Sequence, residues 1–477
     1  MSNSALTISN SKACAAVAFV AAAVLALAIG RDLLHMPLQV SDSLSLIADA
    51  ALAPSAWDAF YQHLSGSGYF RPLFYAEVKA LFDLGHHFLA YRLFHALLVF
   101  AFFMLFVRAL EVRDRLSLLC LPLALTVFVG IHTFLATVKE QYPVPHFLQV
   151  AVLALVALNL TQSKGGVLID AALLLTFSLA ALTLESGLLV WVVVVAAWVS
   201  GMPGVSKRAV IGITVLLATY MWMRFGFYGT GLPTIDDRAV GFWLEQLDPP
   251  EIRERFGDNF APLYLYNMAA SALSLLFSEP RSGIWVTVRD SLVAVHIVNV
   301  TASLFATGLV GWYVVSRLRS GVRRPVTLAD RHVVIFAAVL VANVAISYAY
   351  AKDEIMSVAG AFYAYPVFGA TVYFLGRWRE RRAPWLTTLV LCAVFLAGSA
   401  VWATRAAGVH HVLRSQAFVQ RNDWTRMERE WRRNGNWEQY RAVLPLVRDL
   451  RHEAISMQVV NPRFVPRWME DVFDRYY

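Results

Sequence analysis

The run ACAAVAFVAAAVLALAIG, residues 13–30, contains no charged side chain and is long enough to cross a bilayer as a helix. Lys12 is the one basic residue before it, so the positively charged start of a secretory leader is weak. The length of the run also suits a span better than the shorter apolar core of a leader. We therefore interpret this stretch as the first of several membrane helices.

The composition favours a polytopic membrane protein. Hydrophobic residues make up 58% of the 477 residues, charged residues 16%, and the mean hydropathy is +0.55. The net charge of +8 comes from short basic runs at the ends of apolar segments, as in RLRSGVRR at 317–324. That pattern is typical of cytoplasmic loops, so we expect no nucleic-acid partner. Cys14, Cys120 and Cys392 lie in apolar stretches and predict no disulfide framework.

Ten further apolar runs follow the first one. We therefore expect an all-α polytopic membrane protein with about eleven transmembrane helices. Their approximate ranges are 13–30, 87–108, 116–137, 146–161, 166–184, 186–200, 209–226, 291–316, 333–350, 361–376 and 385–403.

The distribution of lysine and arginine predicts the orientation. With a cytoplasmic N-terminus, the basic loops share the cytoplasmic side of an inner membrane, and the C-terminus lies outside. A span at 261–280 would move the two most basic loops outside, so we expect an interfacial or re-entrant helix there. We divide the chain into a membrane domain, 1–403, with outer loops at 31–86 and 227–290, and an extracytoplasmic helical segment, 404–477.

Polar residues that could carry chemistry gather in the expected outer loops, because the span centres are nearly free of charge. The first loop holds Asp42 and Arg71. Asp42 could be a catalytic acid or the N-cap of the following helix, and Arg71 could bind phosphate or extend to the interface beside Tyr69 and Phe70. The chain shows neither internal repeats nor the paired broken helices of many transporters.

Two other outer loops carry candidate groups. HTFLATVKEQYPVPH, residues 132–146, contains His132 and Glu140. The tight turn LTLESGL, residues 182–188, contains Glu185 as the one charge between two spans. A carboxylate at such depth needs a partner or a task, unless it is exposed at the membrane edge or caps the next helix with Ser186.

Together these motifs resemble the membrane half of GT-C superfamily glycosyltransferases, and most of all the protein O-mannosyltransferases and the tetratricopeptide-type O-mannosyltransferases. The matching positions are Asp42 after the first span, Arg71 with Pro72 in YFRPLFY, and His95 in YRLFHALLVFA. GIHTFLATVKE resembles the family's histidine loop, and LTLESGL its Lys-Glu-x-Gly turn, which Glu185 and Gly187 match. The chain departs from the pattern at Ser41, in place of a first acid, and at Leu184, in place of the lysine.

The resemblance implies a sugar on a polyprenyl phosphate as donor and a glycan, lipid or protein hydroxyl as acceptor, at the outer face of the membrane. It implies Asp42 as general base of an inverting transfer, with Glu185 as the second catalytic acid. Arg71 and Lys352 would bind the donor phosphate, Lys352 by its position in the last outer loop. Supporting or acceptor-binding residues would be Glu140, His132 and His95.

Cofactors and rival functions follow from the same residues. We expect no cofactor, since a cation clamp can serve in place of a divalent metal, and TIDDR at 234–238 is only a weak metal motif. One alternative is a lipid or polysaccharide transporter or flippase, which would need a polar path through the bundle. The other is a non-enzymatic partner in envelope assembly, in which Asp42 would be dispensable.

Overall fold

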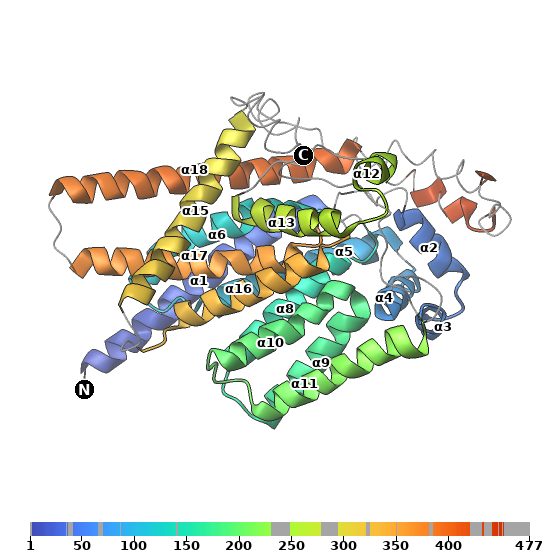
Figure 1. Cartoon of the computed structure of the whole chain (residues 1–477), viewed down its shortest axis with the longest axis horizontal. Helices are drawn as coiled ribbons and strands as arrows, with labels where there is room; N and C mark the ends of the chain where they lie inside the picture. Colours follow the sequence, from blue (N-terminus) through green and yellow to red (C-terminus); the bar gives the residue numbers. More distant parts are fainter. Residues whose placement is uncertain are drawn as a thin grey trace.

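The computed structural model is helical throughout the part of the chain that it describes (Figure 1). This part comprises residues 2–34, 36, 42–64, 70–85, 87–139, 142–229, 249–277, 294–320, 325–349, 351–380, 385–419, 432–433, 441–446, 448–450 and 452. The prediction of an all-α membrane protein is confirmed, since these residues include many long apolar helices.

The central helix is α17, Ser357–Glu380, which packs against α6, α15 and α16. In the most apolar part of α17, 83% of the residues are buried, compared with 11% in α18, Trp385–Val419. The other long helices are α1 (Ser2–Leu34), α5 (His87–Leu110), α15 (Ala294–Arg319) and α16 (Leu328–Ile346). The exposed side chains of α18 are largely apolar, as expected for a helix that faces lipid.

Seven helices among the described residues are long and apolar enough to cross a membrane, or up to nine if two bent pairs each form one span. The bent pairs are α6 (Arg115–Gly130) with α7 (His132–Val138), at 63°, and α12 (Pro249–Phe256) with α13 (Ala261–Phe277), at 113°. α11 (Lys207–Met221) continues into a π-helical turn, η2 (Trp222–Phe227).

The expected number of about eleven spans is therefore not confirmed. Three of the predicted spans form shorter helices: α8 (His146–Gln162), α9 (Val167–Thr183) and α10 (Leu189–Val199), with 17, 17 and 11 residues. At about 1.5 Å per residue, 17 residues cover about 26 Å, less than the roughly 30 Å of a hydrocarbon core. Hydropathy alone did not reveal this, because these segments are as apolar as the longer ones.

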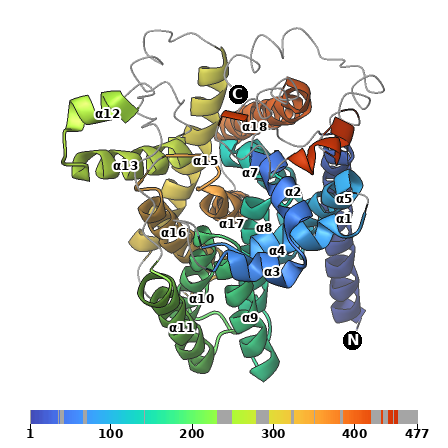
Figure 2. The same cartoon turned by 90° about the vertical axis from the view of Figure 1, so that its right-hand side faces the viewer.

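Three short helices form a platform at the opposite end of the bundle from the N-terminus (Figures 1 and 2). They are α2 (Asp42–Leu52), α3 (Ala56–Gln62) and α4 (Pro72–Phe82). Phe74 and Val78 of α4 share a separate buried cluster with Tyr91 of α5, whose hydroxyl donates to the carbonyl of Val78 at 3.0 Å. The predicted first outer loop is thus packed against the bundle.

The expected boundary after residue 403 falls inside a continuous helix, because α18 extends to Val419. Most of 420–477 lies outside the described residues. The run expected to form an interfacial or re-entrant helix at 261–280 corresponds largely to α13, which packs on α15 and α16. The amide of Asn267 donates to the carbonyls of Tyr348 and Ala349, at 3.0 and 3.1 Å, which fixes α13 to the turn after α16.

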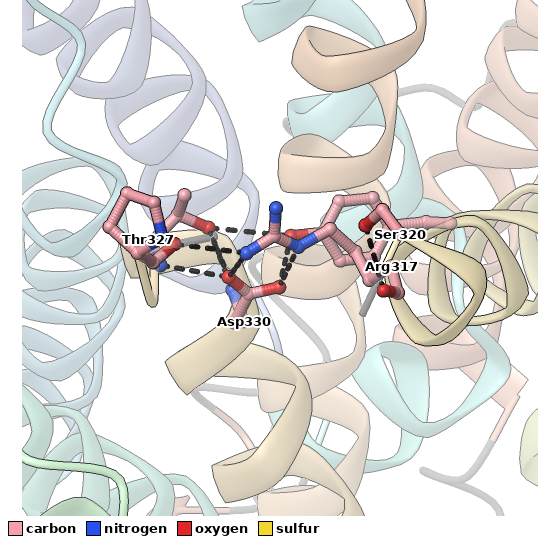
Figure 3. Close-up of polar contacts among 6 residues, drawn as sticks. Arg317, Ser320, Thr327 and Asp330 are labelled. Atoms are coloured by element: carbon pink, nitrogen blue, oxygen red, sulfur yellow. Dashed lines mark hydrogen bonds and ion pairs between the residues drawn. The ribbon is translucent and has the colours of Figure 1, made fainter. Parts of the chain in front are cut away.

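A polar cluster joins α15 to α16 (Figure 3). The guanidinium of Arg317 donates two hydrogen bonds to the carboxylate of Asp330, at 2.8 and 2.7 Å. The same carboxylate accepts from the backbone and hydroxyl of Thr327, both at 2.8 Å, and from the hydroxyl of Tyr313 at 2.7 Å. Because its oxygens are occupied within the hairpin, we assign Asp330 a structural role.

We expect Arg317→Ala to lower the free energy of unfolding by about 2 kcal/mol, because it leaves a carboxylate without its paired charge. Arg319→Ala is a matched control, since Arg319 is exposed two residues away; it should change stability by less than about 0.5 kcal/mol. Unfolding in detergent micelles measures both. Equal effects of the two variants would contradict a role for this pair in stabilising the hairpin.

Candidate functional site

The main candidate site is a partly buried cluster in which one carboxylate lies between two guanidinium groups. Oε2 of Glu185 is 3.0 Å from both Nε and Nη2 of Arg71, and Oε1 is 3.4 Å from Nη2 of Arg224. The Glu185 side chain is 16% exposed, that of Arg71 19% and that of Arg224 4%. The three segments are far apart in sequence, and their meeting gives the cluster a formal charge of +1.

A tight turn positions Glu185. It begins η1 (Glu185–Leu188), a single 3-10 turn between α9 and α10, and Leu184 before it is extended. A Cβ at position 187 would lie 1.9 Å from the carbonyl oxygen of Ala180, so only glycine allows η1 to lie this close to α9. Gly187, which matches the glycine of the GT-C turn, therefore allows η1 and its Glu185 to pack against the end of α9.

Arg71 reaches the cluster from the start of α4. Proline at position 72 occupies the first turn of that helix, where its missing N–H costs nothing. The backbone N–H of Phe70 donates to Oε1 of Glu185 at 3.3 Å, so the carboxylate binds both the main chain and the side chain of this segment. Glu185 is thus not exposed at the membrane edge, and Arg71 is bound to it.

Arg224 was not identified from the sequence. It lies in η2, the π-helical turn at the end of α11, and π-helical turns occur frequently at functional sites. Its Nη1 donates to the hydroxyl of Tyr220 at 3.1 Å. In the sequence Arg224 is the one arginine near the end of the apolar run 209–226, which is predicted as a span. Aromatic rings of Phe70, Tyr220 and Tyr228 line this part of the cluster.

The charges in the cluster keep Glu185 ionised. Burial opposes ionisation, but the guanidinium groups of Arg71 and Arg224 outweigh it and hold the pKa of Glu185 below its ordinary value. An ionised, doubly paired Glu185 is poorly suited to accept a proton. It is better suited to orient the two arginines.

His132 belongs to a second polar group. Nε2 of His132, the first residue of α7, is 3.0 Å from Oγ of Ser274 and 3.5 Å from Oδ1 of Asp353. Asp353 therefore faces His132, and Lys352 beside it is exposed. This group brings together α7, α13 and the turn between α16 and α17.

Tyr348 lies in the turn between α16 and α17. Burial raises its pKa, the neighbouring Tyr264 raises it further, and the charges of Arg224 and Glu185 also act on it. Lys352 follows four residues later in the chain and is exposed.

The described contacts of His95 are with residues outside the Glu185 cluster. It is fully buried in α5, and its Nδ1 lies 3.3 Å from Nη1 of Arg92. Nε of Arg92 in turn donates to the carbonyl of Met36 at 2.8 Å. These contacts tie α5 to the chain after α1, so His95 has a structural position.

Two of the predicted residues remain open. Asp42 is the first residue of α2, which leaves both the catalytic and the capping hypotheses standing, and its side chain lies outside the described part of the structure. Glu140 lies entirely outside the described residues. Positions 42 and 49 are two turns apart on one face of α2.

A cavity of about 360 Å³ opens between α2, α3 and α4. Asp49, Gln62, His63 and Tyr75 supply its polar lining. The rings of His63 and Tyr75 stack with their centroids 3.4 Å apart. Because α2 starts at Asp42 and α4 starts beside Arg71, this cavity lies on the same platform as the predicted base and the observed cluster.

Glu77, on α4, is a second buried carboxyl at this end of the bundle. Its Oε1 accepts a hydrogen bond from Gln149 at 2.8 Å, and its Oε2 has no hydrogen-bond partner among the described residues. Burial raises the pKa of Glu77 to about 7, although the bond from Gln149 lowers it in part. Glu77 therefore changes its charge near neutral pH.

Glu77 should make stability depend on pH. With an ordinary pKa of 4.5 and a folded value of about 7, the folded chain holds this proton more tightly than the unfolded chain does. The resulting stability is complete below pH 4.5 and is lost as the pH rises through 7. We expect a loss on the order of 3 kcal/mol across this window in the wild type and a much flatter profile in Glu77→Gln. Unfolding measured across the window tests this, and an unchanged slope in the variant would contradict it.

Within the described residues, no three His, Cys, Asp or Glu side chains lie close enough together to hold a metal ion. Comparison with models of known protein families, with curated proteins and with solved structures finds no match to this chain.

Proposed function

We propose that this protein is a GT-C type glycosyltransferase that moves a sugar from a polyprenyl phosphate to a hydroxyl of a cell-envelope glycan, lipid or protein. The observation that carries the proposal is the meeting of Arg71, Glu185 and Arg224 at the end of the bundle that bears the α2 to α4 platform. Two of these three residues were selected beforehand for this function from segments 114 residues apart.

The arginines suit the leaving group of such a reaction. When the bond between the anomeric carbon and the phosphate oxygen breaks, negative charge grows on the phosphate. Arg71 and Arg224 offer planar guanidinium groups, and a phosphate can bind such groups through two oxygens at once. Glu185 would hold both groups in place before the donor arrives. Lys352, which follows Tyr348 in the adjacent turn, could add a third cation.

The acceptor would enter from the platform. Asp42 would take the proton of the acceptor hydroxyl. At the same time the hydroxyl oxygen of the acceptor would attack the anomeric carbon on the side opposite the phosphate. The new glycosidic bond then has inverted configuration, and polyprenyl phosphate leaves. The cavity between α2, α3 and α4 is a suitable place for the acceptor, because it has polar lining residues and lies along α2, the helix that begins at Asp42. The mechanism needs no metal cofactor.

This function also requires a particular topology. Under the proposal the shorter helices α8, α9 and α10 cross the inner membrane as well, which gives about eleven spans, a cytoplasmic N-terminus and an extracytoplasmic C-terminus. The basic turns between spans support that orientation. Labelling of single cysteines placed at Gly166 and at the exposed Leu84 of the first outer loop tests it, since the two must react from opposite sides.

The direct test is glycan transfer in proteoliposomes that contain the full chain and a panel of polyprenyl-phosphate sugars. We expect release of polyprenyl phosphate together with a new glycosidic bond for one donor class. Movement of the intact lipid-linked sugar across the bilayer without bond cleavage would instead favour a flippase. Binding of envelope proteins with neither result would favour an assembly partner.

A further inference from the structure

A second cavity lies at the end of the bundle that carries the N-terminus, opposite the platform of α2, α3 and α4 (Figure 1). It has a volume of about 330 Å³ and lies between α1, α5 and α8. Its lining combines charged groups with an apolar wall formed by Ala15, Ala18, Phe19 and Val107. The mechanism proposed above makes no use of it.

The charged part of the lining is basic. Lys12 of α1, Arg108 in the last turn of α5, and Arg113 in the turn after α5 contribute three cations, against one carboxylate, Glu111. Nη2 of Arg113 lies 2.9 Å from that carboxylate. Lys12 and Arg108 are exposed and come from separate helices, so they add to the net positive charge of the cavity.

Two residues of the lining have fixed conformations. Glu111 directly follows the end of α5 and has φ +53, a left-handed conformation that commonly closes a helix. Asn159 is only 6% exposed, and its amide nitrogen donates to the carbonyls of Leu105 and Leu155, at 3.0 and 2.8 Å. The bond to Leu105 ties α8 to α5 and so fixes two walls of the cavity.

The position of the cavity identifies the class of ligand. The uncharged apolar run of α1 begins at Ala13 and α5 ends at Leu110, so Lys12 and Arg108 lie at the boundary between hydrocarbon and head groups. The apolar wall continues along α1 into exposed side chains, including Val20, Val24 and Leu27. A ligand that fits both halves has an anionic head and an apolar chain.

We infer that this cavity binds the head group of an anionic phospholipid, with its phosphate at Lys12 and Arg108 and an acyl chain along α1. Basic pockets between membrane helices on the cytoplasmic side bind such head groups in other proteins. Phosphatidylglycerol, whose head group carries one negative charge and no cation, is a lipid of this kind. The inference does not depend on the proposed transferase activity.

Native mass spectrometry of the full chain, with phosphatidylglycerol or phosphatidylcholine added to the detergent, tests this site. We expect Lys12→Gln/Arg108→Gln to reduce binding of phosphatidylglycerol about tenfold and to leave binding of phosphatidylcholine unchanged. The charge-conserving variant Lys12→Arg/Arg108→Lys should bind as the wild type does, which also shows that the fold tolerates changes here.

A matched control separates this cavity from general surface charge. Lys207 and Arg208 are exposed at the start of α11, next to a turn in which Gly204 donates to Thr161 of α8, so they lie at the same end of the bundle. Lys207→Gln/Arg208→Gln should leave binding of phosphatidylglycerol unchanged. An equal loss in both double variants, or no loss in the first, would overturn the inference. Displacement of the lipid by an equal concentration of inorganic phosphate would show a site for free anions instead, and would overturn it too.

Discussion

Replacement of Glu185 with glutamine is expected to abolish glycan transfer and to lower the free energy of unfolding by about 3 kcal/mol. The carboxylate now separates the guanidinium groups of Arg71 and Arg224, and the Arg224 side chain is only 4% exposed. A neutral amide would leave two cations facing each other with little access to water. Unfolding in detergent micelles and transfer in proteoliposomes measure the two effects.

A double variant distinguishes lost charge balance from lost packing. Glu185→Gln/Arg224→Gln removes one charge of each sign, so it should recover part of the stability lost by Glu185→Gln while transfer stays absent. If Glu185→Gln is as stable as the wild type, the cluster does not hold the arginines in the way proposed. If the double variant regains transfer, Arg224 has no part in binding the donor.

The general architecture and two of the three cluster residues could be predicted from the sequence. Hydropathy predicted an all-α membrane protein, and the tight LTLESGL turn indicated that Glu185 needs a partner. Arg71 was selected because an arginine before a proline in an aromatic loop is unusual. That these two residues meet could not be derived from spacing, because their contact depends on how α4 packs beside α9.

Other features required the structure because they depend on backbone geometry. Arg224 could not be identified from the sequence, because it lies in an apolar run and a π-helical turn has no clear signal in a single sequence. Gly187 was recognised as part of a motif, but its close approach to Ala180 emerged only with the fold. His95 shows the converse: its position matched a motif, yet it is buried against Arg92 inside the bundle.

The second large effect is expected at Asp42. Asp42→Asn should reduce the rate of transfer by about 10²-fold to 10⁴-fold, which is the usual contribution of a general base, because an amide cannot take the proton of the acceptor hydroxyl. The donor phosphate would bind at Arg71 and Arg224, which this change leaves intact, so donor affinity should stay within about twofold of the wild type. The change also keeps a side chain that can cap α2.

Asp58→Asn is a suitable control for this experiment. Asp58 is a carboxylate in the same outer segment, and its described contacts are with Ser55 at the start of α3. The control should retain full transfer, with a small loss of stability at most. A comparable loss of transfer in both variants would indicate general damage to the platform.

The most direct test of the account is single-turnover transfer by Asp42→Asn, measured with bound polyprenyl-phosphate donor beside the wild type and Asp58→Asn. If Asp42 is the general base, donor binding stays normal and the rate falls by about 10²-fold to 10⁴-fold in Asp42→Asn alone. Transfer at the wild-type rate in Asp42→Asn would contradict it, because the hydroxyl proton would then go elsewhere and Asp42 would remain the cap of α2.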